Sequence, residues 1–394
     1  MLSFNFVKID FQKFTFNIFN TMKIKSLIIF SILLTSTVAM SQQATDKTVF
    51  YTRLEGVIGT NIHVTANIIR LFDELSGNYQ YRFINEDTKM HFGKTICLNG
   101  EVTNENAKLK EMGQNSDAFI GTFNKKSFTG TWNTPDNRQV DFNFKEYYPN
   151  GTLPFEIYYL HSEDKLVAKD VKSPTAEIEL TLIFPKDNYF QAGIVDSVKQ
   201  LIANSFFGND FYENNPDSML THFENEYFSN YKKQNEDWYG KGASFSWQKT
   251  INMSVIFNSN YLLCFEYLKY AYSGGAHGMT NVAYDIINLN NSSILTYNDI
   301  FEEGTDDSLS NILTQMLRKD YSIPYSIPLK EAGFFVDSIV PNHNIYINGS
   351  GIGFLYNSYE IAPYSNGQTN IFLEFDKIKQ LLKKGTPVSM MRDR

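Results

Sequence analysis

Apolar residues at every second position, interrupted by glycine-containing turns, dominate residues 51–148 of this chain. Because side chains alternate across a pleated backbone, each such run marks one face of a strand. Ile62, Val64 and Ala66 share a face in this way. Short alternating runs with turns about every ten residues are typical of a small antiparallel barrel or sandwich. We therefore expect residues 45–161 to form a β-rich N-terminal domain, an antiparallel β meander arranged as a barrel or a sandwich.

In three places within this region, an aromatic residue follows a glycine by two positions, at 77–79, 121–123 and 130–132. Rings beside a permissive backbone could form a flat platform for carbohydrate. The commoner role of a glycine within a strand is a bend or bulge, with the neighbouring ring in the core. Both interpretations stay open on the sequence.

Beyond residue 175 the pattern becomes mixed, with apolar residues at strand spacing in some segments and at helix spacing in others. Strands are expected at 178–184, 245–257, 261–272 and 282–289, and helices at 194–202, 217–239, 305–321 and 376–384. Residues 176–388 should therefore form an α+β domain with an antiparallel sheet and helices packed on one face. The charged stretch 162–175 contains Pro174 and lacks a periodic apolar face, so we expect it to be a linker between the two domains.

The first 41 residues have the features of a leader followed by a signal peptide. Lys23 and Lys25 precede an apolar run at 27–34, and small residues at 39–41 suit cleavage before Gln42. The run is too short to span a bilayer, so the mature chain should contain no integral membrane segment. We expect Met22 to be the true start and the protein to be exported, either periplasmic or secreted.

The net charge of the chain favours some classes of binding partner over others. The formal net charge is −8, and removal of residues 1–41, with four lysines and one aspartate, would make it −11. An acidic chain disfavours nucleic acid and anionic lipid, whose binding depends on clustered Lys and Arg. It suits a cationic partner, although the charge could also serve only solubility.

The chain has two cysteines, Cys97 and Cys264. They could pair in an oxidising compartment. Both lie in apolar strand patterns within different expected domains, where a thiol acts as a small hydrophobic side chain. Two unpaired, buried thiols are the preferred interpretation.

The phrase Tyr272-Ser-Gly-Gly-Ala-His277-Gly follows a continuously apolar strand. Gly274 and Gly275 allow positive φ values, so the chain can turn sharply and carry His277 out at the strand end. There the imidazole could act as a base, or as a metal ligand near Asp285. Alternatively the phrase is only a structural turn whose histidine bonds the local backbone.

The second phrase, Tyr359-Glu360-Ile-Ala-Pro363-Tyr364, follows the apolar run at 353–356. Pro363 fixes its own φ and favours an extended residue before it, which indicates a rigid exposed loop. Two tyrosines around one carboxylate suit a binding site, because tyrosine is a rigid anchor and a fixed Glu pairs with Lys or Arg. The alternative is that both rings close the core and Glu360 is merely solvated.

Several other sequence patterns do not match known catalytic, metal-binding or cofactor-binding motifs. His222 has no second histidine at metal-binding spacing, the acidic group at 299–307 lacks a calcium-loop pattern, and 349–353 does not complete a dinucleotide fingerprint. A nucleophile elbow is also missing from the sequence. We therefore expect no catalytic constellation, no metal and no cofactor. The ligand-binding candidates are Tyr272, Gly274, Gly275, His277, Tyr359, Glu360 and Tyr364.

Residues 177–384 resemble the C-terminal extracellular domain of the RsiV and PdaC family. The resemblance depends on 272–278, 284–286, 298–301 and 359–367, which match in order and spacing. It implies an exported protein, and in RsiV this region senses lysozyme. The deacetylase activity in PdaC belongs to a separate domain whose motifs this chain lacks, so that activity is not implied.

These observations favour an exported envelope binding module of unknown ligand. A cationic protein such as lysozyme and a cell-wall component are the two ligand candidates. The alternatives are a cell-wall glycan or peptide hydrolase using His277 and Glu360, or a purely structural envelope protein. The hydrolase requires those two side chains to converge in one cleft.

Overall fold

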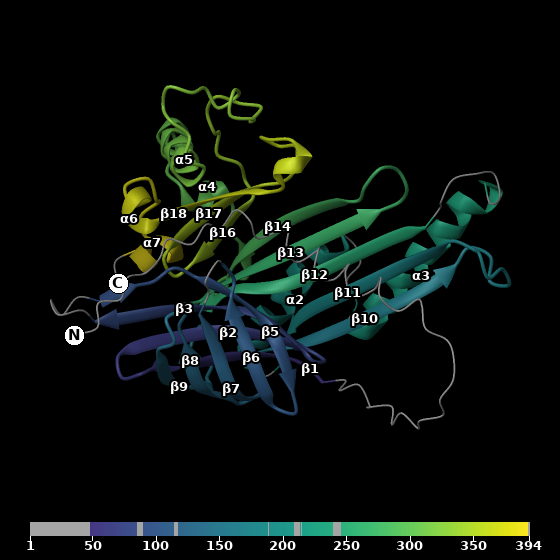
Figure 1. The fold of residues 1–394 in the computed structure, drawn as a ribbon, viewed down its shortest axis with the longest axis horizontal. Helices are drawn as coiled ribbons and strands as arrows, with labels where there is room; N and C mark the ends of the chain where they lie inside the picture. Colours follow the sequence, from purple (N-terminus) through teal and green to yellow (C-terminus); the bar gives the residue numbers. More distant parts are fainter. Residues whose placement is uncertain are drawn as a thin grey trace.

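The structure is a computed structural model that describes residues 48–392, apart from 85–89, 114–116, 188, 209–212, 214 and 239–245. The expected leader, signal peptide and start at Met22 lie outside the described residues. Within the described part, no helix combines the length and apolar character needed to cross a bilayer. The chain forms three sheets, and the first of them lies below the other two in Figure 1.

The N-terminal sheet closes on itself as a barrel. Eight strands follow the order β2-β1-β9-β8-β7-β6-β5-β3, and β2 also pairs with β3, while β4 extends the β3 edge. All of these pairs are antiparallel, which confirms the predicted meander and selects the barrel. The strands are β1 (Val49–Ile58), β2 (Ile62–Leu71), β3 (Glu74–Ile84), β4 (Met90–Phe92), β5 (Ile96–Thr103), β6 (Asn106–Glu111), β7 (Ala118–Asn124), β8 (Ser127–Asn133) and β9 (Gln139–Glu146).

The barrel interior holds the rings that follow its glycines. Tyr79, Phe123 and Trp132 are all buried. A Cβ on Gly121 would lie 2.0 Å from the Thr129 carbonyl oxygen of the neighbouring strand, so only glycine permits the close approach of β7 and β8 there. The core placement of these rings is therefore confirmed, and they form no carbohydrate platform.

The second sheet has six strands in the order β10-β11-β12-β13-β14-β15. Its elements are β10 (Phe155–Lys165), β11 (Thr175–Pro185), β12 (Trp247–Ser259), β13 (Leu262–Tyr272), β14 (Met279–Asn288), β15 (Ser293–Ile294) and, between β11 and β12, α2 (Ala192–Phe207), α3 (Pro216–Asn235) and the 3-10 turn η2 (Glu236–Trp238). Every pair is antiparallel except β11 and β12, which run parallel. This one pair departs from the expected antiparallel arrangement, because the two-helix crossover returns the chain to the same end of the sheet.

Strand β13 shows why the middle of this sheet is apolar on both faces. Leu263 and Phe265 pack in the core that contains α2 and α3, whereas Leu262 and Cys264 belong to the core beneath the third sheet. Alternate residues of one strand therefore enter different cores. Helices α2 and α3 cover one face, as predicted, and the third sheet covers part of the other (Figure 1).

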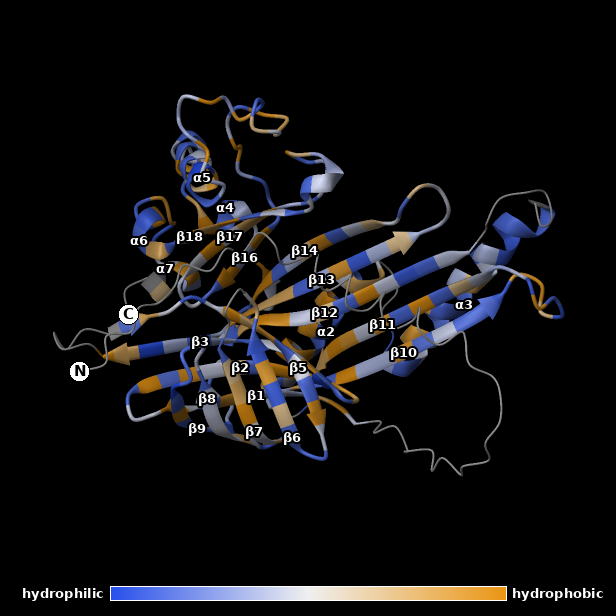
Figure 2. Ribbon diagram, in the orientation of Figure 1, coloured by the Kyte–Doolittle hydropathy of each residue, from blue (hydrophilic) through white to orange (hydrophobic). Residues whose placement is uncertain are grey.

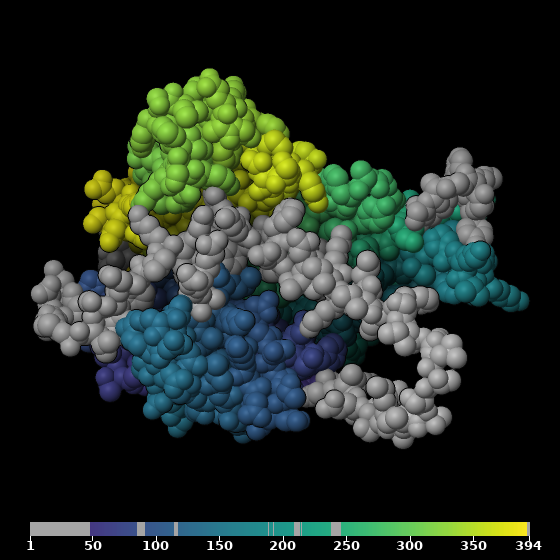
Figure 3. Space-filling view, in the orientation of Figure 1, coloured from purple at the N-terminus to yellow at the C-terminus, as the bar shows by residue number. Residues whose placement is uncertain are grey.

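The third sheet has three antiparallel strands, and the short helices of the C-terminal region surround it. The elements are α4 (Tyr297–Ile300), α5 (Asp306–Asp320), β16 (Ile345–Asn348), β17 (Gly351–Tyr356), η3 (Tyr364–Asn366), β18 (Thr369–Glu374), α6 (Phe375–Ile378) and α7 (Pro387–Arg392). In the space-filling view, α5 and the loop after it protrude at the top of the molecule (Figure 3).

The expected helix at 376–384 is wrong in extent, since α6 contains only its first turn. Beyond that turn, Leu382 forms an isolated antiparallel bridge with Phe301. The Glu302 N–H donates to the Leu381 carbonyl and the Lys383 N–H to the Ile300 carbonyl. These tertiary hydrogen bonds replace those that would have continued the helix.

The expected linker at 162–175 is also wrong. Strands β10 and β11 pair along their whole lengths, from Phe155 opposite Pro185 to Lys165 opposite Thr175, so this segment is the closed end of a hairpin. The end of β10 is hydrophilic, as its blue colour in Figure 2 shows. Because these strand residues are hydrophilic, the sequence shows no alternation of apolar and polar residues here.

Buried polar contacts join the barrel to the second sheet. The Arg53 guanidinium donates to the Asn258 carbonyl at 3.0 Å and to the Tyr147 carbonyl at 2.7 Å. The Asn258 side chain in turn accepts from the Leu153 N–H and donates to the Leu153 carbonyl. Each polar group therefore has a partner, which is required where water is excluded.

Cys97 and Cys264 are unpaired, in agreement with the preferred interpretation. Cys264 is buried in β13, and Cys97 is half-buried in β5. Burial raises the pKa of the Cys97 thiol to about 12, so this thiol stays protonated and unreactive at neutral pH.

Candidate functional site

The first candidate loop connects β13 to β14. Gly274 and Gly275 have φ values of 107° and 98°, in the region that favours glycine, and they reverse the chain. The Tyr272 hydroxyl closes the loop by donating to the Gly275 carbonyl at 3.1 Å. His277 is exposed at the end of this turn, and its Nδ1 lies 2.9 Å from the Gly278 carbonyl oxygen. The local backbone bond that the structural alternative required is thus present.

The second candidate loop connects β17 to β18 and is anchored from below. Ile361 and Ala362 are buried, and the Phe335 N–H donates to the Ile361 carbonyl at 2.8 Å. Tyr359 lies above these residues with 49% of its surface exposed and a φ of 72°. Its N–H donates to the Ala362 carbonyl at 3.0 Å, which closes a tight turn around the strained residue.

The two loops meet through their rings. The His277 and Tyr364 rings are stacked with centroids 4.1 Å apart, and the Tyr359 and Tyr364 centroids are 5.8 Å apart. The Tyr364 hydroxyl also donates to the Gly278 carbonyl of the first loop at 3.1 Å. We call His277, Tyr364 and Tyr359 the aromatic row. Segments more than 80 residues apart in sequence therefore display one surface.

The hydrogen bond of His277 to the backbone indicates the tautomer of its neutral ring. The Gly278 carbonyl oxygen is only an acceptor, so Nδ1 must carry the proton in the neutral ring. Nε2 then holds the lone pair, and no partner for it occurs among the described residues. A neutral imidazole in this tautomer presents an acceptor beside the Tyr364 ring.

Glu360 lies next to the aromatic row but does not reach His277. Asn342 Nδ2 is 3.3 Å from Glu360 Oε2, and Asn357 Nδ2 is 3.5 Å from Glu360 Oε1. In the part of the chain that the structure describes, no hydrogen bond or ion pair joins Glu360 to His277. The two titratable groups are adjacent features of one surface, without the contact that a catalytic pair would need.

Asn357 fixes the second loop against the second sheet and was not identified from the sequence. Its side-chain oxygen accepts from the Val282 N–H at 2.8 Å, and its Nδ2 donates to the Val282 carbonyl at 3.0 Å. The amide thereby reproduces the pairing of a neighbouring strand on β14. The sequence gives no local signal for this role, because the contact joins residues 75 positions apart. In the sequence, Asn357 cannot be distinguished from any other asparagine in a loop.

Tyr270 is a second residue that the sequence did not single out. A Cβ on Gly278 would lie 2.3 Å from the Tyr270 hydroxyl oxygen, so glycine is needed for this ring to pack under the loop. Burial, with Tyr364 and Tyr272 nearby, raises the pKa of Tyr270. Its position two residues before Tyr272 placed both rings on one strand face, a signal that was available in the sequence.

Asp285, the proposed metal partner of His277, is elsewhere. It follows Gly278 by seven residues along β14, a distance of about 23 Å in an extended strand. Burial raises the pKa of its carboxyl. The two residues therefore cannot share one ion.

Comparisons with known proteins agree with this architecture. Residues 171–280 match the family model for deacetylase PdaC, and residues 298–376 match the model for a protein of unknown function, DUF3298. The first matched region contains the loop at 272–278, and the second matched region contains the loop at 359–367. Curated proteins yield no significant match.

Two crystal structures of DUF3298 family proteins are similar to this chain. The protein from Bacteroides fragilis has 23% identity and a TM-score of 0.57 over 62% of this chain and 99% of its own length. The protein from Pseudomonas aeruginosa has 14% identity and a TM-score of 0.43 over 60% and 97%. The first similarity shows a shared fold. Together with the two family matches, it shows that the C-terminal part of this chain is a PdaC/RsiV-type domain of unknown function.

Proposed function

We propose that this protein is an exported binding protein that captures a ligand of the cell envelope with its aromatic row. The observation that carries the proposal is the stacking of His277 on Tyr364, with Tyr359 beside them and half exposed. Exposed rings grouped in this way contribute little to a core. They are the residue types that supply most of the binding energy in protein interfaces.

The support beneath the row favours binding without a large entropy cost. Both loops are closed by backbone or hydroxyl hydrogen bonds, and Asn357 ties the second loop to β14. Rings held in place before the ligand arrives lose little freedom on binding. A surface built only as a pair of turns would not need this anchoring.

Charge supports a cationic ligand. Glu360 is exposed beside Tyr359, and Asn342 and Asn357 hold its carboxylate in place. The whole chain has a net charge of −8. A basic protein would be attracted to this surface at long range and could pair with Glu360 at contact. Lysozyme is the probe we choose, since the resemblance to the RsiV and PdaC family points to it.

Calorimetric titration of the tag-free chain with lysozyme at low salt tests this proposal. We expect measurable binding that weakens steeply as salt rises. Tyr364→Ala and Tyr359→Ala should each weaken it by about tenfold or more, corresponding to about 1.4 kcal/mol. Glu360→Gln should reduce the salt dependence. Tyr189→Ala is the matched control, because Tyr189 is 60% exposed and lies outside the row.

The outcomes separate the ligand candidates. An absence of heat with lysozyme would remove the cationic-protein version. Retention of the chain on purified peptidoglycan, lost in Tyr364→Ala and kept in Tyr189→Ala, would support a cell-wall ligand instead. Equal binding by all of these variants in both assays would contradict the role of the aromatic row. The hydrolase alternative is not favoured, because His277 and Glu360 are held by different partners.

Export is a separate part of the proposal. The basic and apolar segments before residue 41 motivate it. Fractionation of producing cells, followed by N-terminal sequencing of the mature chain, should place the protein outside the cytosol with Gln42 first. A chain recovered from the cytosol with its N-terminus intact would contradict this part and leave the binding proposal to its own test.

A further inference from the structure

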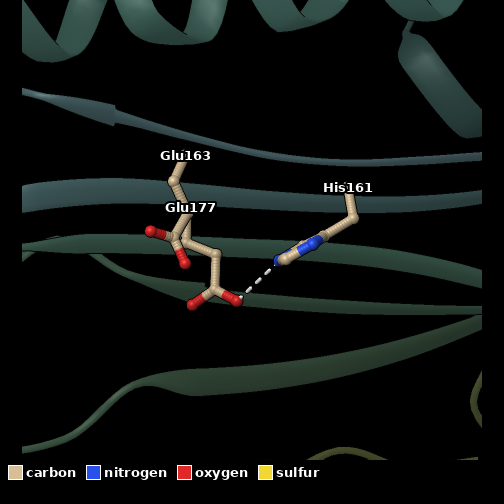
Figure 4. A group of neighbouring side chains, drawn as sticks. All are labelled: His161, Glu163 and Glu177. Atoms are coloured by element: carbon tan, nitrogen blue, oxygen red, sulfur yellow. Dashed lines mark hydrogen bonds and ion pairs between the residues drawn. The ribbon is translucent and has the colours of Figure 1, made fainter. Parts of the chain in front are cut away.

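We propose that His161, Glu163 and Glu177 form a binding site for a divalent transition metal, with zinc the best-suited ion. Their ligand atoms all lie within 4.8 Å of one another. His161 Nε2 is 3.0 Å from Glu177 Oε1, and Figure 4 shows the Glu163 carboxylate beside that of Glu177. This site lies outside the aromatic row and does not depend on the ligand-binding proposal.

The hairpin register brings the three side chains together. Glu163 is directly opposite Glu177 across the β10–β11 pair, and His161 precedes Glu163 by two residues. Residues two apart on a strand, and residues directly opposite on neighbouring strands, project from the same face of the sheet. The cluster therefore belongs to backbone that is paired on both sides of Glu177, and no loop has to move to assemble it.

The donor set selects the type of ion. An imidazole nitrogen with two carboxylates suits zinc and similar transition metals, whereas calcium and magnesium prefer an all-oxygen shell. Tetrahedral zinc bonds of about 2.0–2.2 Å place two ligand atoms about 3.3 Å apart, close to the distance between His161 and Glu177. Three protein ligands would leave a fourth position open for water.

The charges at the cluster are unbalanced without a cation. Like charges directly opposite each other on paired strands are destabilising, and Glu163 faces Glu177 in this way. Within the described residues, neither carboxylate forms an ion pair with a lysine or an arginine. Glu179, opposite His161, adds a third carboxyl group on the same face. A divalent ion would neutralise the two facing glutamates.

Glu177 is already oriented for coordination. Gln248 Nε2 donates to its Oε2 at 2.8 Å, which leaves Oε1 directed at His161. Hydrogen bonds of this kind from outside the metal's own ligands fix a carboxylate and commonly accompany metal sites. Gln248 is in turn opposite Tyr272 on β13, so both of these side chains project from the same face of the sheet as Glu177.

His222 provides a matched control on the same molecule. It is also an exposed histidine between two glutamates, but Glu213 lies 3.4 Å from its Nδ1 and Glu226 lies 3.6 Å from its Nε2. The two nitrogens of an imidazole point to different edges of the ring. One ion therefore cannot be bound by His222 and both of these carboxylates.

Titration calorimetry of the metal-free, tag-free chain with ZnCl2 tests the site. We expect one strong zinc site and far weaker binding of CaCl2. His161→Ala and Glu163→Gln should each lower the zinc affinity by about tenfold or more, and His222→Ala should leave it unchanged. Loss of nitrogen ligation in His161→Ala should also change the visible absorption of bound Co²⁺. Circular dichroism establishes that each variant is folded.

Two results would overturn the proposal. The first is a folded wild-type chain that does not bind zinc, which would make His161 and Glu177 an ordinary ion pair. The second is zinc binding that survives both His161→Ala and Glu163→Gln, which would place the ion elsewhere. Reduced affinity in Glu163→Gln matters most, because Glu163 has no part in the His161–Glu177 hydrogen bond.

Discussion

Aromatic side chains have different surroundings in the barrel and in the aromatic row. In the barrel, Phe119 is 1% exposed, and its ring contacts those of Tyr79 and Phe142 with centroids 5.3 and 5.1 Å away. In the row, Tyr359 is half exposed, and Tyr364 is its only ring neighbour among the described residues. The same residue class thus supplies packing energy in one region and a displayed surface in the other. Ile361 and Ala362, which lie beneath the row, are buried and anchor the loop that carries the exposed rings.

Phe119→Ala should produce the largest loss of stability. Removing a fully buried ring from the barrel leaves a cavity, and we expect the free energy of unfolding to fall by about 4 kcal/mol. Urea denaturation followed by tryptophan fluorescence measures this. A loss below about 1 kcal/mol would mean that the barrel rings are not tightly packed, and the contrast with the row would fail.

Arg53→Met should have the next largest effect and tests how firmly the barrel is joined to the second sheet. The guanidinium is 1% exposed and donates to two carbonyls and to Glu55. Loss of these charge-assisted hydrogen bonds should lower the free energy of unfolding by about 2–3 kcal/mol in the same urea experiment.

Lys330→Met is the control for Arg53→Met. Lys330 and Asp337 form an ion pair with both side chains mostly exposed. Such pairs contribute less than about 1 kcal/mol, so this variant should remain close to wild type. Similar losses for Arg53→Met and Lys330→Met would show that the buried junction contributes no more than a surface pair.

Asp117 should make the barrel less stable as the pH rises. Burial, with Glu111 and Asp136 nearby, raises the pKa of its carboxyl to about 7. The folded state therefore holds this proton more tightly than the unfolded state, and its contribution to stability is lost as the pH rises from about 4 through 7. Because Asp117 is partly exposed, we expect a change of about 1 kcal/mol.

Unfolding of wild type and Asp117→Asn at pH 5 and pH 8 measures this contribution. The asparagine variant should show a smaller decrease in stability between the two pH values. Asp141→Asn, an exposed carboxylate of β9, should keep the wild-type decrease. An identical pH dependence in wild type and Asp117→Asn would contradict the assignment.

Tyr359→Ala should have the smallest effect on folding, below about 0.5 kcal/mol, because half of the ring is already in water. Tyr359→Gly should be at least as stable, since glycine relieves the positive φ at this position. Urea denaturation checks both variants. A large loss in either would show that Tyr359 belongs to the core, and the distinction between the two regions would then disappear.

Much of the fold could be predicted because its elements have strong local patterns. Alternation at 178–184 and helical spacing at 194–202 correspond to β11 and α2. The acidic start and basic end of 305–321 correspond to α5. These patterns survive in the sequence because each element has one apolar face against a core.

The hairpin end at 162–175 and the C-terminal segment at 376–384 could not be predicted in the same way. The first is the end of a hairpin with many polar residues, and some of these contact α3, as Asp164 does with Lys232. The second has a helical pattern, but hydrogen bonds to residues 300–302 compete with its helix. In both segments, partners distant in sequence decided the conformation.

By itself, the sequence determined that rings and permissive turns would occur together near His277 and Tyr364, since local spacing sets where a strand ends and a turn begins. Only the tertiary structure decided that these rings stack on each other, that Glu360 stays apart from His277, and that His161 meets two glutamates. The physical reason is that strand register and sheet order bring together residues far apart in the chain. No local pattern encodes that pairing.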